Sequence, residues 1–160
     1  MATVFFPVEY KGLVERLGPK GVTSLDGKTT FSSYMHLMVF AAFVGKRLVD
    51  SELNIEMGGG TNEVGDHVFT NNNLDGVAYL LALHEKKSGD ILREKHEVEC
   101  WKVLERYAAQ GIKEINEWML DRPTDTTGVD TILARMKLEA EGILENDNSF
   151  VEPADVDLML

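Results

Sequence analysis

The stretch of residues 31–45 constrains the fold more than any other part of this sequence. Eleven of its fifteen residues are apolar, and they fall on nearly every side of a helix. This distribution is typical of a helix that is buried rather than amphipathic. Ser32 and Ser33 can cap its start by accepting backbone N–H hydrogen bonds, and Gly45 can adopt the left-handed conformation that closes a helix. We therefore expect a central helix that ends at Gly45.

Apolar residues recur at helical spacing in several other segments. A short helix opened by Pro7 is expected, because proline fits the first turn of a helix. Further helices are expected over residues 73–87, 91–121 and 129–144, the first of them capped by the asparagines at 71–73.

The long segment over residues 91–121 is the most amphipathic of the chain. Gly111 is expected to end or kink it. Its buried stripe is predicted to contain Ile91, Val98, Trp101, Leu104 and Ala108.

Residues 46–69 are polar and show no sustained period, so they are expected to form a loop with one short extended piece at residues 53–57. The predicted fold class is therefore all-α: a compact bundle of five or six helices around a buried central helix, with minor strand content near residues 3–6 and 53–57. A single helical domain is expected over residues 1–144, followed by an acidic C-terminal tail over residues 145–160.

Charge is the next constraint, because the chain carries a net charge of −11. A long basic surface for phosphate contacts is missing, which disfavours tight autonomous DNA binding. The few clusters of basic residues have two interpretations that stay open. They are cations that stabilise helix C-termini, or they form a nucleic-acid or partner patch when the helices pack. These basic residues are Lys46, Arg47, Lys86, Lys87, Arg93 and Lys95.

The acidic tail also has two readings, a frayed terminus or a docking peptide that its acids steer toward a basic partner. In the second reading the anchors are Val156, Leu158, Met159 and Leu160.

No pattern of residues predicts an active site. His96 and Cys100 stand four apart on one helix, but no second Cys/His pair completes a zinc site. His36 is interpreted as a satisfied core or rim residue more readily than as a base. The glycines at 58–60 lack the lysine of a phosphate loop. We therefore expect no catalytic, cofactor-binding or metal-binding residues and a protein that is not an enzyme.

The location is predicted from three further features. The chain has one cysteine, which leaves no intrachain disulfide framework. Its longest apolar run is too short to span a bilayer, and the N-terminus lacks the pattern of a signal peptide. A cytoplasmic protein is therefore expected.

Self-association is also indicated, because many soluble helical domains form twofold homodimers.

Several stretches, in their order along the chain, resemble a known family. They are 31–34 (FSSY), 37–42 (LMVFAA) and 44–45 (VG), a polar loop reaching Val68-Phe69, an asparagine cluster, 77–83 (VAYLLAL), 90–94 (DILRE) and 104–112 (LERYAAQGI). This order resembles the small proteins called DNA phosphorothioation (Dnd) system-associated protein 4, over about residues 20–120.

The resemblance implies a bacterial accessory protein that is encoded with a system placing sulphur on the DNA backbone, or restricting DNA that lacks it. It carries over no catalytic residues. The leading hypothesis is an accessory protein-interaction component of a DNA phosphorothioation modification/restriction (anti-phage defence) system, whose partners are other proteins of that system. The alternative is a DNA-binding regulator that uses the local basic patch.

Overall fold

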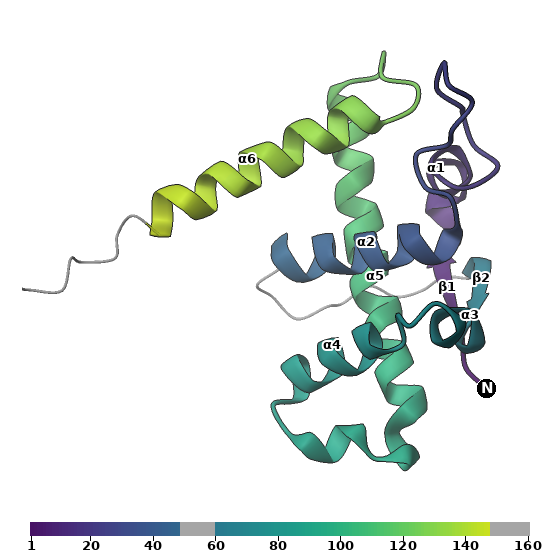
Figure 1. Cartoon of the computed structure of the whole chain (residues 1–160), viewed down its shortest axis with the longest axis vertical. Coiled ribbons are helices and arrows are strands. Elements are labelled where there is room, and N and C mark those ends of the chain that lie inside the picture. The colour runs from purple at the N-terminus through teal and green to yellow at the C-terminus, as the bar shows by residue number, and fades with distance from the viewer. Residues whose placement is uncertain (49–59, 148–160) are drawn as a thin grey trace, which may run out of the picture.

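The computed structural model describes residues 1–48 and 60–147, and these residues fold mainly into helices (Figure 1). The prediction of an all-α bundle is confirmed, since the only sheet in the described residues has two strands. No helix in these ranges combines the length and the apolar character needed to cross a membrane. The elements are β1 (Thr3–Pro7), η1 (Val8–Tyr10), α1 (Lys11–Leu17), α2 (Tyr34–Leu48), β2 (Gly60–Gly65), α3 (Asp66–Asn71), α4 (Gly76–Lys86), η2 (Gly89–Leu92), η3 (Glu94–His96), α5 (Glu97–Asp121) and α6 (Val129–Asp147).

Helix α2 crosses the middle of α5, and small residues set how closely the two helices approach (Figure 1). A Cβ added at Gly45 would overlap the backbone carbonyl of Tyr107, and one added at Gly111 would overlap that of Ala41. The prediction that Gly45 ends the central helix is wrong, because α2 continues beyond it. The expected end or kink at Gly111 is also wrong, because α5 is one continuous helix. Both glycines allow backbone contact between the helices.

The start of α2 is capped by serine, as predicted. Ser33 Oγ accepts the backbone N–H of His36 at 3.1 Å, and the His36 ring Nδ1 lies 2.9 Å from the same hydroxyl. The helix begins one residue after Ser33, so Phe31 lies outside it. The Phe31 ring instead packs against Phe40, with 5.3 Å between ring centroids.

Strands β1 and β2 pair antiparallel on the flank of α5. The strand expected near residues 3–6 is confirmed by β1. The loop expected over residues 46–69 is wrong from Gly60 onward, where β2 and α3 form, and the extended piece expected at residues 53–57 lies outside the described residues. The sequence of β2, GTNEVG, has little strand preference of its own. Pairing with β1, which is distant in the chain, decides its conformation.

A buried carboxylate fastens β1 to α5. The strand register shifts between Val4 and Phe6, and here the N–H of Phe5 donates to Glu105 Oε2 at 2.9 Å. The other oxygen, Oε1, accepts a hydrogen bond from Lys102 Nζ at 3.0 Å. Glu105 is only 5% exposed. Each of its oxygens has a donor, which compensates the cost of burying the charge.

The asparagines at 71–73 do not cap α4 as predicted. Asn71 ends α3 instead, and Asn73 adopts a left-handed conformation with φ of 56°, which asparagine tolerates better than most residues. Helix α4 then begins at Gly76.

Helix α5 begins later than predicted, at Glu97, because two 3₁₀ turns precede it. The prediction for Val98 is consequently wrong, since its side chain is exposed. The other four members of the predicted stripe are buried, namely Ile91, Trp101, Leu104 and Ala108.

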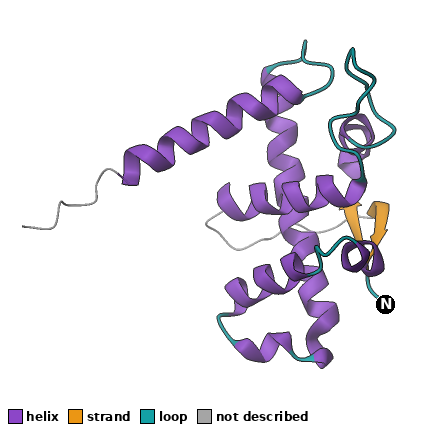
Figure 2. Ribbon diagram, in the orientation of Figure 1, coloured by secondary structure: helices purple, strands orange, loops and turns teal. Residues whose placement is uncertain are grey.

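Helix α6 confirms the predicted final helix and extends it to Asp147. It leaves the top of α5 and projects away from the other helices, above the C-terminal half of α2 (Figure 2).

Candidate functional site

The base of α6 is held in place by the loop that precedes it. Arg16 on α1 donates from Nε to the carbonyl oxygen of Thr126 at 2.8 Å and from Nη2 to that of Asp125. Thr30 Oγ1 donates to the carbonyl oxygen of Thr127 at 2.6 Å. These contacts come from two elements distant in sequence. They fix the direction in which α6 leaves the body.

The first turn of α6 is organised by the side chain of Asp125. Its Oδ1 accepts the N–H of Gly128 at 2.9 Å, and its Oδ2 accepts the N–H and the hydroxyl of Thr131 at 2.8 and 2.7 Å. Burial alone would raise the pKa of Asp125, but these hydrogen bonds outweigh it and hold the pKa below its usual value. The ionised carboxylate therefore stabilises the folded state.

We expect Asp125→Asn to destabilise the protein by about 1–2 kcal/mol near pH 7. The carboxylate accepts hydrogen bonds at both oxygens, whereas the amide has one oxygen that accepts and an NH₂ group that only donates. Since the folded pKa is lowered, the contribution is present above the unfolded value of about 3.9 and is lost as the pH falls through the folded pKa. Urea unfolding near pH 7 and near pH 3 measures this difference. Asp130→Asn, an exposed acid in the same turn, is the matched control and should cost little. An Asp125→Asn effect that persists undiminished in acid would contradict the assignment.

The apolar stripe of α6 is only partly covered. Its residues recur at three- and four-residue spacing, which places them on one face of the helix. Ile132 is buried near the base, whereas Leu133, Met136 and Ile143 are about half exposed. The stripe therefore continues outward along α6 beyond the part that packs on α5.

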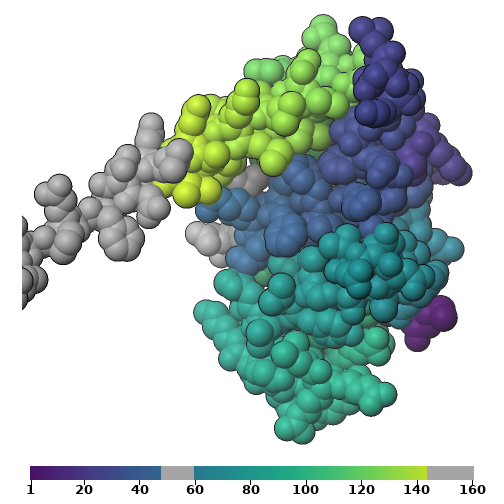
Figure 3. Space-filling model, viewed as in Figure 1, coloured from purple at the N-terminus to yellow at the C-terminus, as the bar shows by residue number. Residues whose placement is uncertain are grey.

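An apolar groove lies between this stripe and the C-terminal half of α2. Its volume is about 250 Å³, and the space-filling view shows α6 overhanging α2 at this place (Figure 3). The wall from α2 includes the half-exposed ring of Phe43. The lining residues are Phe40, Phe43, Val44, Arg47, Trp118, Met136, Glu139, Ala140 and Ile143.

The polar groups of the groove are already paired. The indole N–H of Trp118 donates to Glu114 Oε1 at 2.9 Å, so a ligand finds only the apolar face of this ring. Arg47 on α2 lies 3.6 Å from Glu139 on α6, and this exposed ion pair joins the two walls. The groove is thus suited to holding apolar side chains of another segment, as grooves that receive peptides do.

Apart from Arg47, the groove residues were not among the sites predicted from sequence. Phe43 and Met136 belong to apolar helical patterns, and such patterns predict burial. One signal was available: α6 carries several large apolar residues, namely Ile132, Leu133, Met136, Leu138 and Ile143. Their number does not show which of them the fold leaves uncovered.

The structure divides the six predicted basic residues between two places. Lys46 and Arg47 end α2, beside the groove. The other four lie near the N-terminal end of α5: at the end of α4, just after it, between η2 and η3, and in η3. They are Lys86, Lys87, Arg93 and Lys95.

Carboxylates accompany four of these cations. Lys86 Nζ lies 2.8 Å from Glu99, and Arg93 and Lys95 both approach Asp90, at 2.7 and 3.9 Å. Arg47 pairs with Glu139, as described. The basic groups therefore form mixed-charge clusters with neighbouring acids, and no feature of this arrangement favours the DNA-binding alternative.

His96 and Cys100 have separate environments. His96 lies between two acids, with Nε2 at 3.4 Å from Asp90 and Nδ1 at 3.3 Å from Glu99. The Cys100 thiol is buried and donates to the carbonyl oxygen of Ile91 at 3.4 Å, and burial raises its pKa. Within residues 1–48 and 60–147, no group of three or more His, Cys, Asp or Glu side chains is placed to hold a metal ion. The predicted docking anchors Val156, Leu158, Met159 and Leu160 lie outside the described residues.

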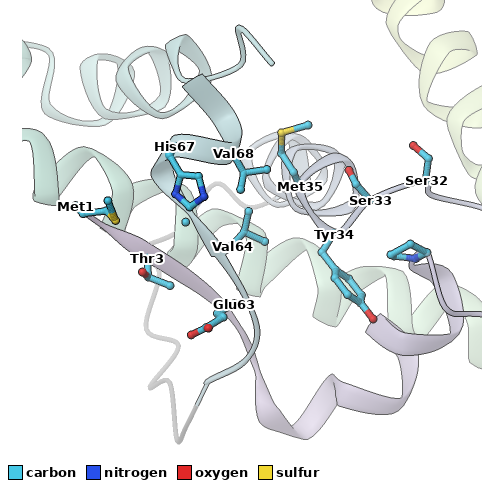
Figure 4. Close-up of a pocket in the computed structure, with 12 residues that line it drawn as sticks. Met1, Thr3, Ser32, Ser33, Tyr34, Met35, Glu63, Val64, His67 and Val68 are labelled. Carbon is cyan, nitrogen blue, oxygen red and sulfur yellow. The ribbon is translucent and has the colours of Figure 1, made fainter. Parts of the chain in front are cut away.

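A second cavity, of about 470 Å³, lies between the β1–β2 sheet and the start of α2. Figure 4 shows Thr3, Glu63 and His67 along one side and Ser33 and Tyr34 along the other. The Ser33 hydroxyl is already engaged in capping α2. His36 lies exposed beside this cap. The cavity mixes isolated polar groups with apolar ones, and the contact between Ser33 and His36 at its edge belongs to the cap of α2.

Comparison with known proteins gives one result. The family model described as DNA sulphur modification system-associated protein 4 matches residues 6–151. This match confirms the resemblance that was predicted over residues 20–120 and extends it at both ends. No curated protein and no solved structure shows significant similarity to the chain.

Proposed function

Since this chain belongs to the family of DNA sulphur modification system-associated protein 4, we propose that it is an accessory component of such a system and works by binding another of its proteins. In this role the protein is an adaptor and not an enzyme, and it acts in the cytoplasm. The system that it assists modifies or restricts DNA in defence against phage. The groove between α2 and α6 is the binding surface.

The observation that carries this proposal is the uncovered apolar lining of the groove. Phe43, Met136 and Ile143 are each about half exposed around the buried ring of Trp118. A surface that presents large apolar side chains on a fixed frame is typical of a protein-binding site. The frame is fixed here by the Arg16 and Asp125 contacts at the base of α6, so little ordering is needed when a partner binds.

The chemistry of the rim indicates what a partner presents. Arg47 lies on the rim, and Lys46 precedes it at the end of α2. A partner segment with apolar side chains and flanking carboxylates would fill the groove, and its carboxylates would compete with Glu139 for Arg47. We therefore propose an acidic, apolar segment of a modification-system protein as the partner's contact.

The test is capture of the other proteins of the system by the tagged full chain from its native host, with each captured protein identified. We expect Phe43→Ser and Met136→Ser to weaken capture by about 30-fold or more, since losing a central apolar anchor costs about 2 kcal/mol. Because both side chains are half exposed, the free energy of unfolding should change by less than about 1 kcal/mol.

Leu138→Ser is the matched control, because Leu138 lies on the same helix, is similarly exposed and is not part of the groove. It should leave capture unchanged. Capture that is insensitive to Phe43 and Met136, or that enriches no protein of the modification system, would contradict the proposal.

A further inference from the structure

We infer that the C-terminal segment of this same chain, residues 148–160, occupies the groove between α2 and α6 when no partner is bound. The inference rests on the proposed function of the groove, because the segment would then compete with the partner for the same surface. Three features support it: the sequence of the segment, its reach and its charge.

The sequence of the segment has the pattern of an extended peptide with one apolar side. It ends in DVDLML, and side chains two apart point to the same side of an extended backbone. In an extended conformation, Val156, Leu158 and Leu160 would share one side, while Asp155 and Asp157 would share the other. The first set matches the apolar lining of the groove.

The segment begins close enough to reach the groove. It follows Asp147, the last residue of α6, and the groove extends along α6 from Met136 to Ile143. The return path from residue 147 to residue 136 is about 16 Å along the helix axis, at 1.5 Å per residue. Thirteen residues span up to about 43 Å when extended. The chain can therefore reverse after α6 and run back along the groove.

The charge of the segment suits the cations at the end of α2, Lys46 and Arg47. It carries three acids, Glu152, Asp155 and Asp157, and no base. With the apolar side of the peptide in the groove, its acids face the rim, where they would compete with Glu139 for Arg47. Tethering raises the local concentration of the segment to about the millimolar range. Even weak docking is then sufficient to fill the groove.

Disulfide trapping in the full chain tests the inference. The pair Met136→Cys with Leu158→Cys places one thiol in the groove and one in the segment. The control pair, Leu138→Cys with Leu158→Cys, uses the opposite face of α6 at almost the same distance along the chain. We expect the groove pair to form its intramolecular disulfide at least about tenfold faster under mild oxidation, since docking holds one pair of thiols together. The buried Cys100 is present in both.

A second comparison tests the register of the segment. Adding Val156→Ser and Leu160→Ser to the groove pair should remove most of its advantage, whereas adding Met159→Ser, on the other side of the peptide, should not.

Equal rates for the two cysteine pairs would overturn the inference, and so would disulfides that form only between two chains, which would indicate a second copy as the occupant. If trapping succeeds but no system protein is captured, the proposed function fails alone. If trapping fails while groove substitutions abolish capture, only this inference fails.

Discussion

Gly111→Ala should destabilise the protein by about 3 kcal/mol, although alanine is favoured over glycine by about 1 kcal/mol inside a helix. The added Cβ would overlap the Ala41 carbonyl of α2, and a backbone carbonyl cannot rotate away as a side chain can. Relief requires α2 and α5, which share the most extensive contact between two elements, to move apart at their crossing. Thermal unfolding should show a decrease in Tm of about 6–12 °C for a domain of this size.

Gly142→Ala supplies the matched control. Gly142 is also inside a helix, α6, but an added Cβ there would meet nothing within 4 Å. This substitution should raise the free energy of unfolding by up to about 1 kcal/mol. Equal stabilities for the two variants would show that α2 and α5 do not approach through their backbones.

The crossing itself can be tested by a double substitution. Gly45→Ala should resemble Gly111→Ala, because its Cβ would overlap the Tyr107 carbonyl at the same crossing. The two effects should be less than additive, since one separation of the helices relieves both overlaps.

The second large effect is expected at Glu105, where Glu105→Ala should cost about 3 kcal/mol. The substitution leaves the N–H of Phe5 without its acceptor and opens space in a buried site, and both changes are unfavourable. Urea unfolding measures the loss. Hydrogen exchange at the Phe5 amide should report it locally, as reduced protection of β1.

Two further substitutions separate the hydrogen bond from the charge. Glu105→Gln keeps an oxygen that can accept the Phe5 N–H, so it should cost only about 1 kcal/mol. Lys102→Ala removes the exposed partner and should cost less than about 1 kcal/mol. If the alanine and glutamine variants were equally stable, the hydrogen bond to β1 would contribute nothing measurable.

Much of the helical fold could be predicted because helical periodicity and capping are local. The Ser33 cap and the buried members of the stripe on α5 follow from residues within a few positions of each other. The errors have a common origin. Gly45 and Gly111 have the local properties of helix breakers, yet each lies inside a helix. Each is glycine because the backbone of the facing helix leaves no room for a Cβ.

The sheet and the groove show the same limit in two different ways. Strand β2 has little preference of its own and forms because β1 pairs with it. The apolar residues of α6 predict burial, but the anchoring of its base by Arg16 and Thr30 points the helix away from the body. The candidate site therefore arises from the direction of one helix, which no local pattern encodes.

The sequence by itself determined that this chain forms a helical bundle around residues 31–45. The order of its apolar stretches along the chain was sufficient to indicate the family. Only the tertiary structure decided how these residues are used. In it, Gly45 does not end the central helix but lets α2 lie against α5. Phe43, in the third turn of the same helix, remains half exposed in a groove. The physical reason is that hydrogen bonding and periodicity act within one element, whereas contact and exposure depend on the distance between elements.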